Sequence, residues 1–291
     1  MQLDPERGYD LIGDIHGCGH ALARLLDQLG YRLQGGVWRH PRRQVIFLGD
    51  IIDRGPHIRE ALHLVHAMVD HGQAHCIMGN HEFNALGWYM PAPPGSGRDF
   101  VREHSPRFAR LLQETFQQFE HYPEEWKAFR EWFYDLPLFL ETERFRVVHA
   151  CWDSRVIARL RPLLNDGRIN PAILREAGLP GTFICQALDR LLRGTDMPLP
   201  EGMTLTSEEG FVRTFFRTKF WEENPQTYGD VVFQPDGLPE HAARLPLSPQ
   251  QKNRLFLYGP DEPLLFVGHY WRRGRPGPIR DNLACLDYSA V

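Results

Sequence analysis

The sequence predicts a layered α/β fold, and three observations carry this prediction. Short apolar segments alternate with amphipathic helical segments three times in the first half of the chain. Each of these apolar segments ends in a glycine that is followed by aspartate or asparagine. Ligands of α/β folds bind at the carboxyl ends of the strands, so the three polar segments are expected to meet at one place.

The first strand is expected at residues 9–12 and the second, which is wholly apolar, at residues 45–48. Between them, leucines recur with helical spacing over residues 22–29, and Gly30 is placed to end that helix. A second amphipathic helix follows over residues 58–69. This order is strand, helix, strand, helix, as an α/β fold requires.

A third strand is expected at residues 76–78, and the alternation then stops. Residues 91–97 contain three prolines and two glycines and indicate a loop. Ser105 and Pro106 are typical of a helix start, and an apolar stripe follows over residues 108–119. A second, aromatic helix is expected from Pro123. This pair predicts a helical insertion that packs over the α/β core.

The second half contains four further segments that we expect to be strands, at residues 136–140, 145–148, 264–267 and 283–286. The two middle segments are followed closely by a histidine. The intervening stretch, about residues 155–245, is expected to be mostly helical or irregular.

Composition excludes several classes of protein. The 291 residues carry a net charge of −4, which gives no electrostatic reason to expect nucleic-acid or membrane partners. The charged N-terminal segment has no apolar core of the kind that signal peptides contain, and no apolar run reaches the roughly 18 residues of a membrane span. Five cysteines without a CxxC pair argue against a disulfide framework or a structural zinc site. We therefore expect a cytoplasmic protein.

Five short polar segments follow apolar runs and carry the chemistry: Gly13-Asp14-Ile15-His16-Gly17, Gly49-Asp50-Ile51-Ile52-Asp53-Arg54-Gly55, Gly79-Asn80-His81-Glu82, Val148-His149 and Gly268-His269. One such segment alone would be an ordinary turn, because aspartate caps helices and glycine tolerates positive φ. Together they supply the oxygen and imidazole donors that a pair of divalent cations about 3.5–4 Å apart requires. The absence of cysteine from the set favours manganese, iron or zinc over a thiolate site.

The motifs GDIHG, GDIIDRG and GNHE, followed by two isolated histidines, closely resemble those of the calcineurin-like metallophosphoesterases. Within them, the chain resembles the branch of the serine/threonine phosphoprotein phosphatases and the bacterial symmetrical diadenosine tetraphosphate hydrolases. Many other members have Gly-His-x-His, whereas Trp271 stands two residues after His269. The resemblance implies a four-layer α/β/β/α metallophosphoesterase sandwich. It would be one catalytic domain over residues 1–291, with helical insertions near 90–135 and 155–245.

The resemblance also implies a centre of two divalent ions, with manganese expected first and iron or zinc as alternatives. Six residues would be the ligands: Asp14 and His16 for the first ion, Asp50 for both ions, and Asn80, His149 and His269 for the second. A hydroxide that bridges the ions would attack phosphorus in line.

Three further residues would act on the substrate. Arg54 would hold two phosphate oxygens, and His81 would protonate the leaving oxygen while Asp53 orients its ring. Glu82 is expected to cap or orient its turn rather than to bind metal. A second phosphate-binding residue stays open among Arg213, Arg217 and Lys219.

The sequence thus predicts a phosphatase of the serine/threonine protein phosphatase type that hydrolyses phosphomonoesters. Its partner would be a phosphoprotein, a small phosphomonoester or a dinucleoside polyphosphate. One alternative is a symmetrical diadenosine polyphosphate hydrolase, because Tyr270 and Trp271 could stack a base. A remote alternative is a non-catalytic scaffold of the same fold. Such proteins tend to lose metal-ligating residues, whereas this sequence contains all six of the implied ligands. The physiological substrate, the metal, the role of the aromatic insertion and the oligomeric state stay open.

Overall fold

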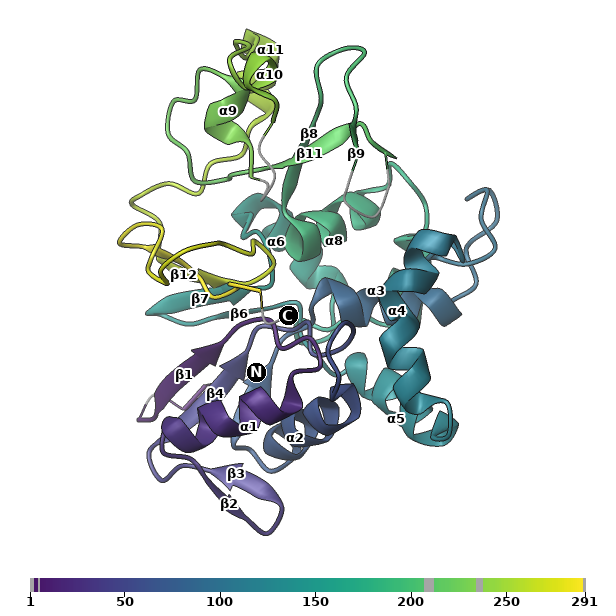
Figure 1. Ribbon diagram of the computed structural model, residues 1–291, viewed down its shortest axis with the longest axis vertical. Helices are drawn as coiled ribbons and strands as arrows, with labels where there is room; N and C mark the ends of the chain where they lie inside the picture. The colour runs from purple at the N-terminus through teal and green to yellow at the C-terminus, as the bar shows by residue number, and fades with distance from the viewer. Residues whose placement is uncertain (1–2, 5, 207–211, 234–237, 290–291) are drawn as a thin grey trace.

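The centre of the computed structural model, which describes residues 3–4, 6–206, 212–233 and 238–289, consists of two β-sheets that face each other (Figure 1). The first sheet is parallel and has the order β1 (Gly8–Ile12), β4 (Arg43–Phe47), β5 (Ala74–Cys76). The second has the order β13 (Leu283–Cys285), β12 (Leu264–Val267), β7 (Phe145–Val148), β6 (Phe139–Glu141). Only β6 runs antiparallel to its neighbour within that sheet.

Alternating side chains explain why both faces of the first sheet are buried. On β4, Val45 and Phe47 belong to the large core cluster that includes the helices. Ile46 and the following Leu48 point the other way, into a second cluster that contains Val147 of the opposite sheet. A strand that is buried on both faces must be apolar throughout, as parallel sheets require.

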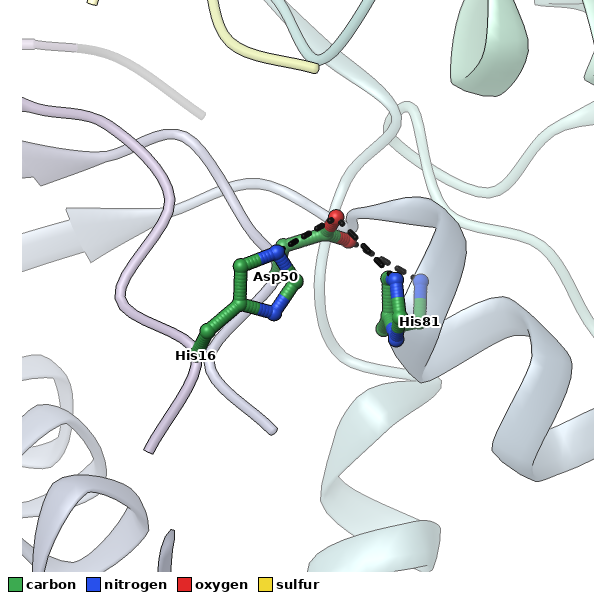
Figure 2. Close-up of side chains that lie close together, drawn as sticks. All are labelled: His16, Asp50 and His81. Atoms are coloured by element: carbon green, nitrogen blue, oxygen red, sulfur yellow. Dashed lines mark hydrogen bonds and ion pairs between the residues drawn. The ribbon is translucent and has the colours of Figure 1, made fainter. Parts of the chain in front are cut away.

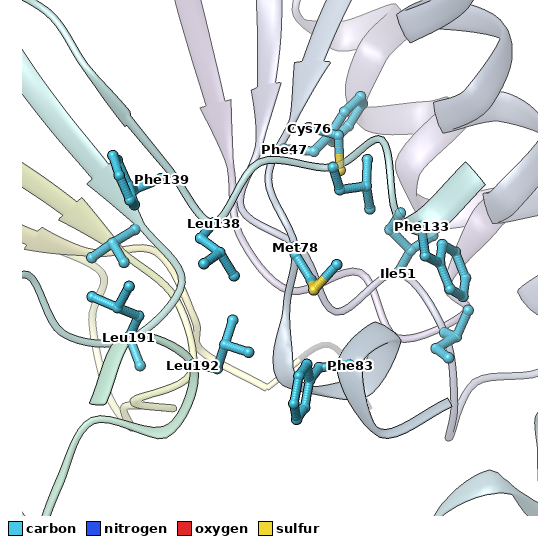
Figure 3. Close-up of a cluster of buried hydrophobic side chains, with 14 of the residues drawn as sticks. Phe47, Ile51, Cys76, Met78, Phe83, Phe133, Leu138, Phe139, Leu191 and Leu192 are labelled. Atoms are coloured by element: carbon cyan, nitrogen blue, oxygen red, sulfur yellow. The ribbon is translucent and has the colours of Figure 1, made fainter. Parts of the chain in front are cut away.

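Helices cover the outer faces of both sheets. The elements α1 (Gly19–Gln28) and α2 (Ile58–Asp70) cover the first sheet, and α6 (Ser154–Leu160) and α8 (Phe183–Arg193) lie over the second (Figure 1). The result is the predicted four-layer α/β/β/α sandwich. Figure 3 shows how Leu191 and Leu192 at the end of α8 approach Leu138 beside β6.

The helices beside the sandwich follow the prediction, with one addition. The elements α4 (Pro106–Phe119) and α5 (Pro123–Phe133) occupy the stretch for which a helical insertion was predicted. The addition is α3 (Asn80–Tyr89), which begins soon after the third strand and packs against α5. The sequence predicted only a turn at this point. Eight of its ten residues are buried, so an amphipathic pattern is absent.

The first part of the stretch over residues 155–245 is mostly helical, and there η1 (Arg161–Leu163) and α7 (Pro171–Glu176) lie between α6 and α8. Two antiparallel pairs that the sequence did not reveal then follow: β8 (Thr195–Pro198) with β11 (Phe215–Thr218), and β9 (Leu205–Thr206) with β10 (Val212–Arg213). Three short helices complete the region: α9 (Tyr228–Val231), α10 (Glu240–Ala243) and α11 (Pro249–Arg254).

Other predicted boundaries were wrong by a few residues. Strand β5 ends at Cys76, and β6 begins only at Phe139, because Pro137 instead accepts a hydrogen bond from Met78 N at 2.9 Å. A further pair, β2 (Arg32–Gln34) with β3 (Val37–Arg39), was not predicted. Among the described residues, which include all five cysteines, no disulfide bond forms. In the same part of the chain, no helix has the length and apolar character needed to cross a membrane.

Candidate metal centre

The carboxyl ends of strands from both sheets meet at Asp50, which lies in the loop that follows β4. Its Oδ2 lies 3.7 Å from His16 Nε2, 3.8 Å from His81 Nε2 and 3.4 Å from His149 Nε2. Figure 2 shows the imidazoles of His16 and His81 on either side of the Asp50 carboxylate. The carboxylate thus lies between nitrogen donors from three different segments.

Asp50 belongs to two groups of possible metal ligands. One contains His16, Asp50 and His81, and the other contains Asp50, His149 and His269. The ligand atoms of each group lie within 4.8 Å of one another. The structure therefore brings together five residues that the sequence selected. It also places His81, predicted only to act on the leaving group, among the possible ligands.

The backbone fixes which nitrogen of each imidazole faces Asp50. His16 Nδ1 lies 3.0 Å from the carbonyl oxygen of Ile52, and His149 Nδ1 lies 2.7 Å from that of Leu48. A carbonyl can only accept, so each Nδ1 carries a proton and the Nε2 atoms are directed to Asp50. Carbonyl partners of this kind commonly orient histidines that bind metals.

The second group also fits a cation. His269 Nε2 is buried and has no hydrogen-bond partner among the described residues, whereas buried polar atoms are normally paired. The backbone N of His269 lies 3.2 Å from both carboxylate oxygens of Asp14, whose side chain is 2% exposed. Asn80 Oδ1 lies 3.0 Å from His149 Nε2. An unpartnered imidazole beside buried oxygen donors is the arrangement that a divalent cation would complete.

Burial and neighbouring charges set the protonation of these groups. Burial and the nearby His81 lower the pKa of His16 to about 3, and burial with the charge of Arg217 lowers the pKa of His269 well below its usual range. Burial would also lower the pKa of His149, but the Asp50 carboxylate outweighs it and raises that pKa to about 10. Without metal, the site therefore combines the neutral imidazoles of His16 and His269 with the imidazolium of His149.

Several site residues adopt a strained backbone. Positive φ angles between 43° and 70° occur at five residues of the predicted site: His16, Asp50, Asp53, Arg54 and His269. Non-glycine residues seldom adopt this left-handed region, and such residues concentrate at functional sites. The strain is thus an independent observation that points to the same loops.

Two glycines allow the backbone to approach the carboxylates closely. A Cβ atom at Gly79 would lie 2.2 Å from Asp50 Oδ1, and one at Gly268 would lie 2.2 Å from Asp14 Oδ1. Neither position has room for a side chain without displacing a predicted ligand. This explains why the motif after each of these strands begins with glycine.

Glu82 caps its own turn, as the sequence predicted, and it also holds the Asp50 loop, which the sequence did not predict. Its carboxylate accepts hydrogen bonds from the backbone N of Asp50 at 2.9 Å, of Ile51 at 2.8 Å and of Gly79 at 3.0 Å. The side chain is completely buried. Three donors to one buried carboxylate fix the loop after β4 against the start of α3.

His81 forms a chain of hydrogen bonds away from Asp50. Its Nδ1 lies 2.5 Å from Asp53 Oδ2, and Thr115 of α4 donates its hydroxyl to the other Asp53 oxygen. Burial would lower the pKa of His81, but the carboxylates of Asp50 and Asp53 outweigh it and raise that pKa. Thr115 was predicted only as part of an apolar stripe, so its contact with Asp53 was missed.

The structure distinguishes the three residues left open for phosphate binding. Arg217 on β11 donates from Nη1 to the carbonyl oxygen of His269 at 2.9 Å. Lys219 instead donates to the carbonyl oxygen of Asp230, and Arg213 is exposed on β10. Arg54 is exposed, and its charge is close enough to depress the pKa of His16.

Asp287 is a site residue that the sequence analysis missed. It is 5% exposed and follows β13, and its charge is the main influence after burial that raises the pKa of Asp14. Its position just after the last predicted strand was the available signal. Acidic residues after the other strands were recognised because they belong to motifs, whereas Asp287 does not.

A family model described as calcineurin-like phosphoesterase matches residues 9–176, which is more than half of the chain. Curated relatives match over part of their length. The chain is 46% identical over 83 residues to the asymmetrical bis(5'-nucleosyl)-tetraphosphatase PrpE of Halalkalibacterium halodurans, covering 28% of this chain and 33% of the relative. It is 32% identical over 142 residues to the same-named protein of Oceanobacillus iheyensis, covering 48% and 54%. The chain thus spans about a third to a half of these relatives.

Solved structures resemble the chain over most of its length. A protein serine/threonine phosphatase from Saccharomyces cerevisiae with similarity to human phosphatase PP5 has 16% identity and a TM-score of 0.45, covering 93% of this chain and 63% of that one. A cold-active protein-tyrosine phosphatase from a psychrophilic Shewanella species has 16% identity and a TM-score of 0.49, covering 99% and 74%.

Proposed function

Because the chain belongs to the calcineurin-like phosphoesterase family and is a hydrolase that acts on phosphate esters, we propose that it hydrolyses phosphomonoesters at a centre of two divalent ions. The observation that carries the proposal is the position of Asp50, whose carboxylate belongs to both groups of possible ligands. One carboxylate shared between two cations is the arrangement that binuclear hydrolases use. Manganese is the first candidate for both ions.

The proposed ligands are the six that the sequence selected. Asp14 and His16 would hold one ion, Asn80, His149 and His269 would hold the other, and Asp50 would be shared by both. The donor set of oxygens and imidazoles suits manganese, iron or zinc. When bound, the two ions supply positive charge at the phosphate and lower the pKa of the water that attacks it.

Protein groups then position the ester and transfer a proton. Arg54, exposed at the site, donates its forked N–H groups to two phosphate oxygens. Arg217, which contacts His269, is the second phosphate-binding residue in this proposal. Asp50 and Asp53 raise the pKa of His81 and so favour the protonated imidazole, from which Nε2 can give a proton to the leaving oxygen.

A second candidate function is cleavage of dinucleoside tetraphosphates. It is favoured by the relatives named as asymmetrical bis(5'-nucleosyl)-tetraphosphatases, which match up to about half of this chain. The sequence analysis considered symmetrical cleavage instead, so the position of cleavage is part of the test. Asymmetrical cleavage of diadenosine tetraphosphate gives ATP and AMP, whereas symmetrical cleavage gives two ADP molecules.

The test compares p-nitrophenyl phosphate, a phosphoserine peptide and diadenosine tetraphosphate, each with manganese and with a chelator. The phosphatase proposal is supported if hydrolysis of the two monoesters depends on manganese and has a higher kcat/KM than hydrolysis of diadenosine tetraphosphate. A higher kcat/KM for diadenosine tetraphosphate favours the second candidate, and its products identify the cleaved bond. If metal-loaded protein hydrolyses none of the three, both proposals fail and the scaffold alternative returns.

A further inference from the structure

A pocket of about 210 Å³ lies between α8, the loop that precedes α4, and α3, the helix that begins with the proposed ligand Asn80. Its lining includes Phe83 of α3, Arg98 and Arg102 of the loop, and Cys185 and Asp189 of α8. It is large enough for several water molecules, each of which occupies about 30 Å³ in the liquid. None of its lining residues is a proposed metal ligand or catalytic residue.

Arg102 brings a partly buried guanidinium, whose Nε is buried, into this pocket. Its Nε is buried and has no hydrogen-bond partner, and no carboxylate of the described residues forms an ion pair with it. Its guanidinium carbon lies 5.2 Å from the centre of the Phe83 ring and 5.7 Å from that of Phe108. Aromatic faces attract a guanidinium but do not satisfy its N–H groups.

The fold around Arg102 is built to accommodate this side chain. A Cβ atom at Gly87 would lie 2.7 Å from Arg102 Cγ, so the absence of a side chain there lets the stem of Arg102 pack on α3. The backbone N of Arg102 donates to the carbonyl oxygen of Gly87 at 2.9 Å. The stem of Arg102 is therefore held against α3, and burial together with Arg193 lowers the pKa of Arg102 well below its usual range.

The only lining carboxylate named above, Asp189, is already neutralised. It forms an ion pair with Arg193, whose other nitrogen donates to Asn84 of α3 at 2.6 Å. Asn84 lies one helical turn after Asn80, a proposed metal ligand. The charges of Asp189 and Arg193 cancel each other, so the lining of the pocket keeps the two positive charges of Arg98 and Arg102.

We propose that this pocket is a second anion site, in which Arg102 from inside and Arg98 from the rim bind a phosphate oxyanion. A doubly charged phosphate matches the charges of the two guanidinium groups and supplies an acceptor for Arg102 Nε, which otherwise has none. The phosphate is either a second phosphate of the substrate or free inorganic phosphate. The site itself shares no residue with the metal centre and stands without the proposed function; only the kinetic test below rests on it.

The first test uses Cys185 as a reporter, because this residue lines the pocket. The manganese-loaded full-length protein is alkylated with and without inorganic phosphate, and modification of Cys185 is followed by peptide mass spectrometry. Only unoccupied protein reacts, so phosphate at about nine times its Kd should slow the labelling of Cys185 about tenfold. Arg102→Gln and Arg98→Gln should abolish this protection.

The matched control is Arg110→Gln, which removes an arginine from α4 that pairs with Glu114 and does not line the pocket. This variant should keep the protection. Arg98 is exposed, so its variant tests the proposal even if Arg102→Gln does not fold. No protection in the wild type, or full protection in both pocket variants, overturns the proposal.

The second test identifies the source of the phosphate. The ratio of kcat/KM for diadenosine tetraphosphate to that for p-nitrophenyl phosphate is compared between wild type and the pocket variants. A ratio that falls about tenfold, the equivalent of about 1.4 kcal/mol, assigns the site to a second substrate phosphate. Lost protection with an unchanged ratio assigns it to free phosphate. If neither substrate is hydrolysed, the proposed function fails while the labelling result still decides the pocket.

Discussion

At the scale of single residues, the candidate centre is a set of buried charges that are tuned by one another. Burial would raise the pKa of Asp50, but His149 and His81 outweigh it and hold that pKa well below its usual value. For Asp14, the neighbouring positive charge does not outweigh burial. Burial together with Asp287 therefore raises the pKa of Asp14 well above the usual range. A carboxylate that resists ionisation in the metal-free protein is one that cations would stabilise.

Replacing Asp53 with asparagine should move the pH profile of turnover. The group that protonates the leaving oxygen must carry its proton, so activity falls as pH rises through the pKa of His81. Asp53 raises this pKa, and its loss should therefore shift the descending limb of kcat against pH to lower pH. The profile is measured with p-nitrophenyl phosphate from about pH 5 to about pH 10, a range that brackets the ordinary histidine pKa of about 6.5.

Asparagine is a suitable replacement because it has the same shape and tolerates the positive φ of 70° at this position. The bound metal should be unchanged in this variant. An unshifted descending limb would mean that His81 is not the proton donor or that Asp53 does not control it.

Metal affinity should increase with pH. An imidazole must be neutral to bind a metal, and the pKa of His149 is raised to about 10 in the metal-free protein. Below that pKa, manganese must displace the proton, so its Kd should fall about tenfold for each pH unit gained. Calorimetric titrations in two buffers of different ionisation enthalpy measure the proton released. Binding that releases no proton at neutral pH would contradict the assignment of His149 as a ligand.

At the scale of elements, the parts of the fold that the sequence could predict are those in which one pattern dominates. The strand over Arg43–Phe47 ends in an apolar run, and the helix over Ile58–Asp70 has one buried face. Both elements were predicted from the sequence. The loops after the strands were predicted because glycine, carboxylate and imidazole recur there. These loops indeed meet around Asp50.

The elements that were missed lack such a pattern. Helix α3 is buried on nearly all sides, so its sequence has no polar face to reveal the helical period. The strand pairs β8 with β11 and β9 with β10 contain two to four residues per strand, too few for alternation to be recognised. Long-range contacts such as Thr115 with Asp53 depend on packing between helices and loops, which no local pattern encodes.

Helix α3 should depend on Glu82 for its attachment to the site. In Glu82→Ala, the backbone N–H groups of Asp50, Ile51 and Gly79 lose their acceptor while they remain buried. Each unsatisfied group costs about 1–3 kcal/mol, so the free energy of unfolding should fall by about 3 kcal/mol or more. Urea unfolding measures this loss.

Glu82→Gln is the matched variant, because it keeps one acceptor oxygen and the same volume. It should lose less stability than Glu82→Ala. Equal stability of both variants and the wild type would show that Glu82 does not hold the Asp50 loop.

At the scale of the whole molecule, the site exists only when both sheets are assembled. Asp14 and Asp50 come from the loops of the first sheet, whereas His149 and His269 follow strands of the second. Asp14 and His269 are 255 positions apart in the sequence, yet the backbone N of His269 contacts the Asp14 carboxylate. Apolar packing between the sheets therefore determines the geometry of the metal centre.

The proposed binuclear centre is tested most directly by the number of manganese ions bound per chain in the wild type, Asp50→Asn and Asp53→Asn. Two ions are expected in the wild type and in Asp53→Asn, because Asp53 contacts His81 and is not a proposed ligand. Asp50→Asn should bind none and lose turnover, since both ions would share that carboxylate in the proposed centre. If Asp50→Asn keeps two ions with unchanged affinity, Asp50 does not bridge them and the proposed binuclear centre is wrong.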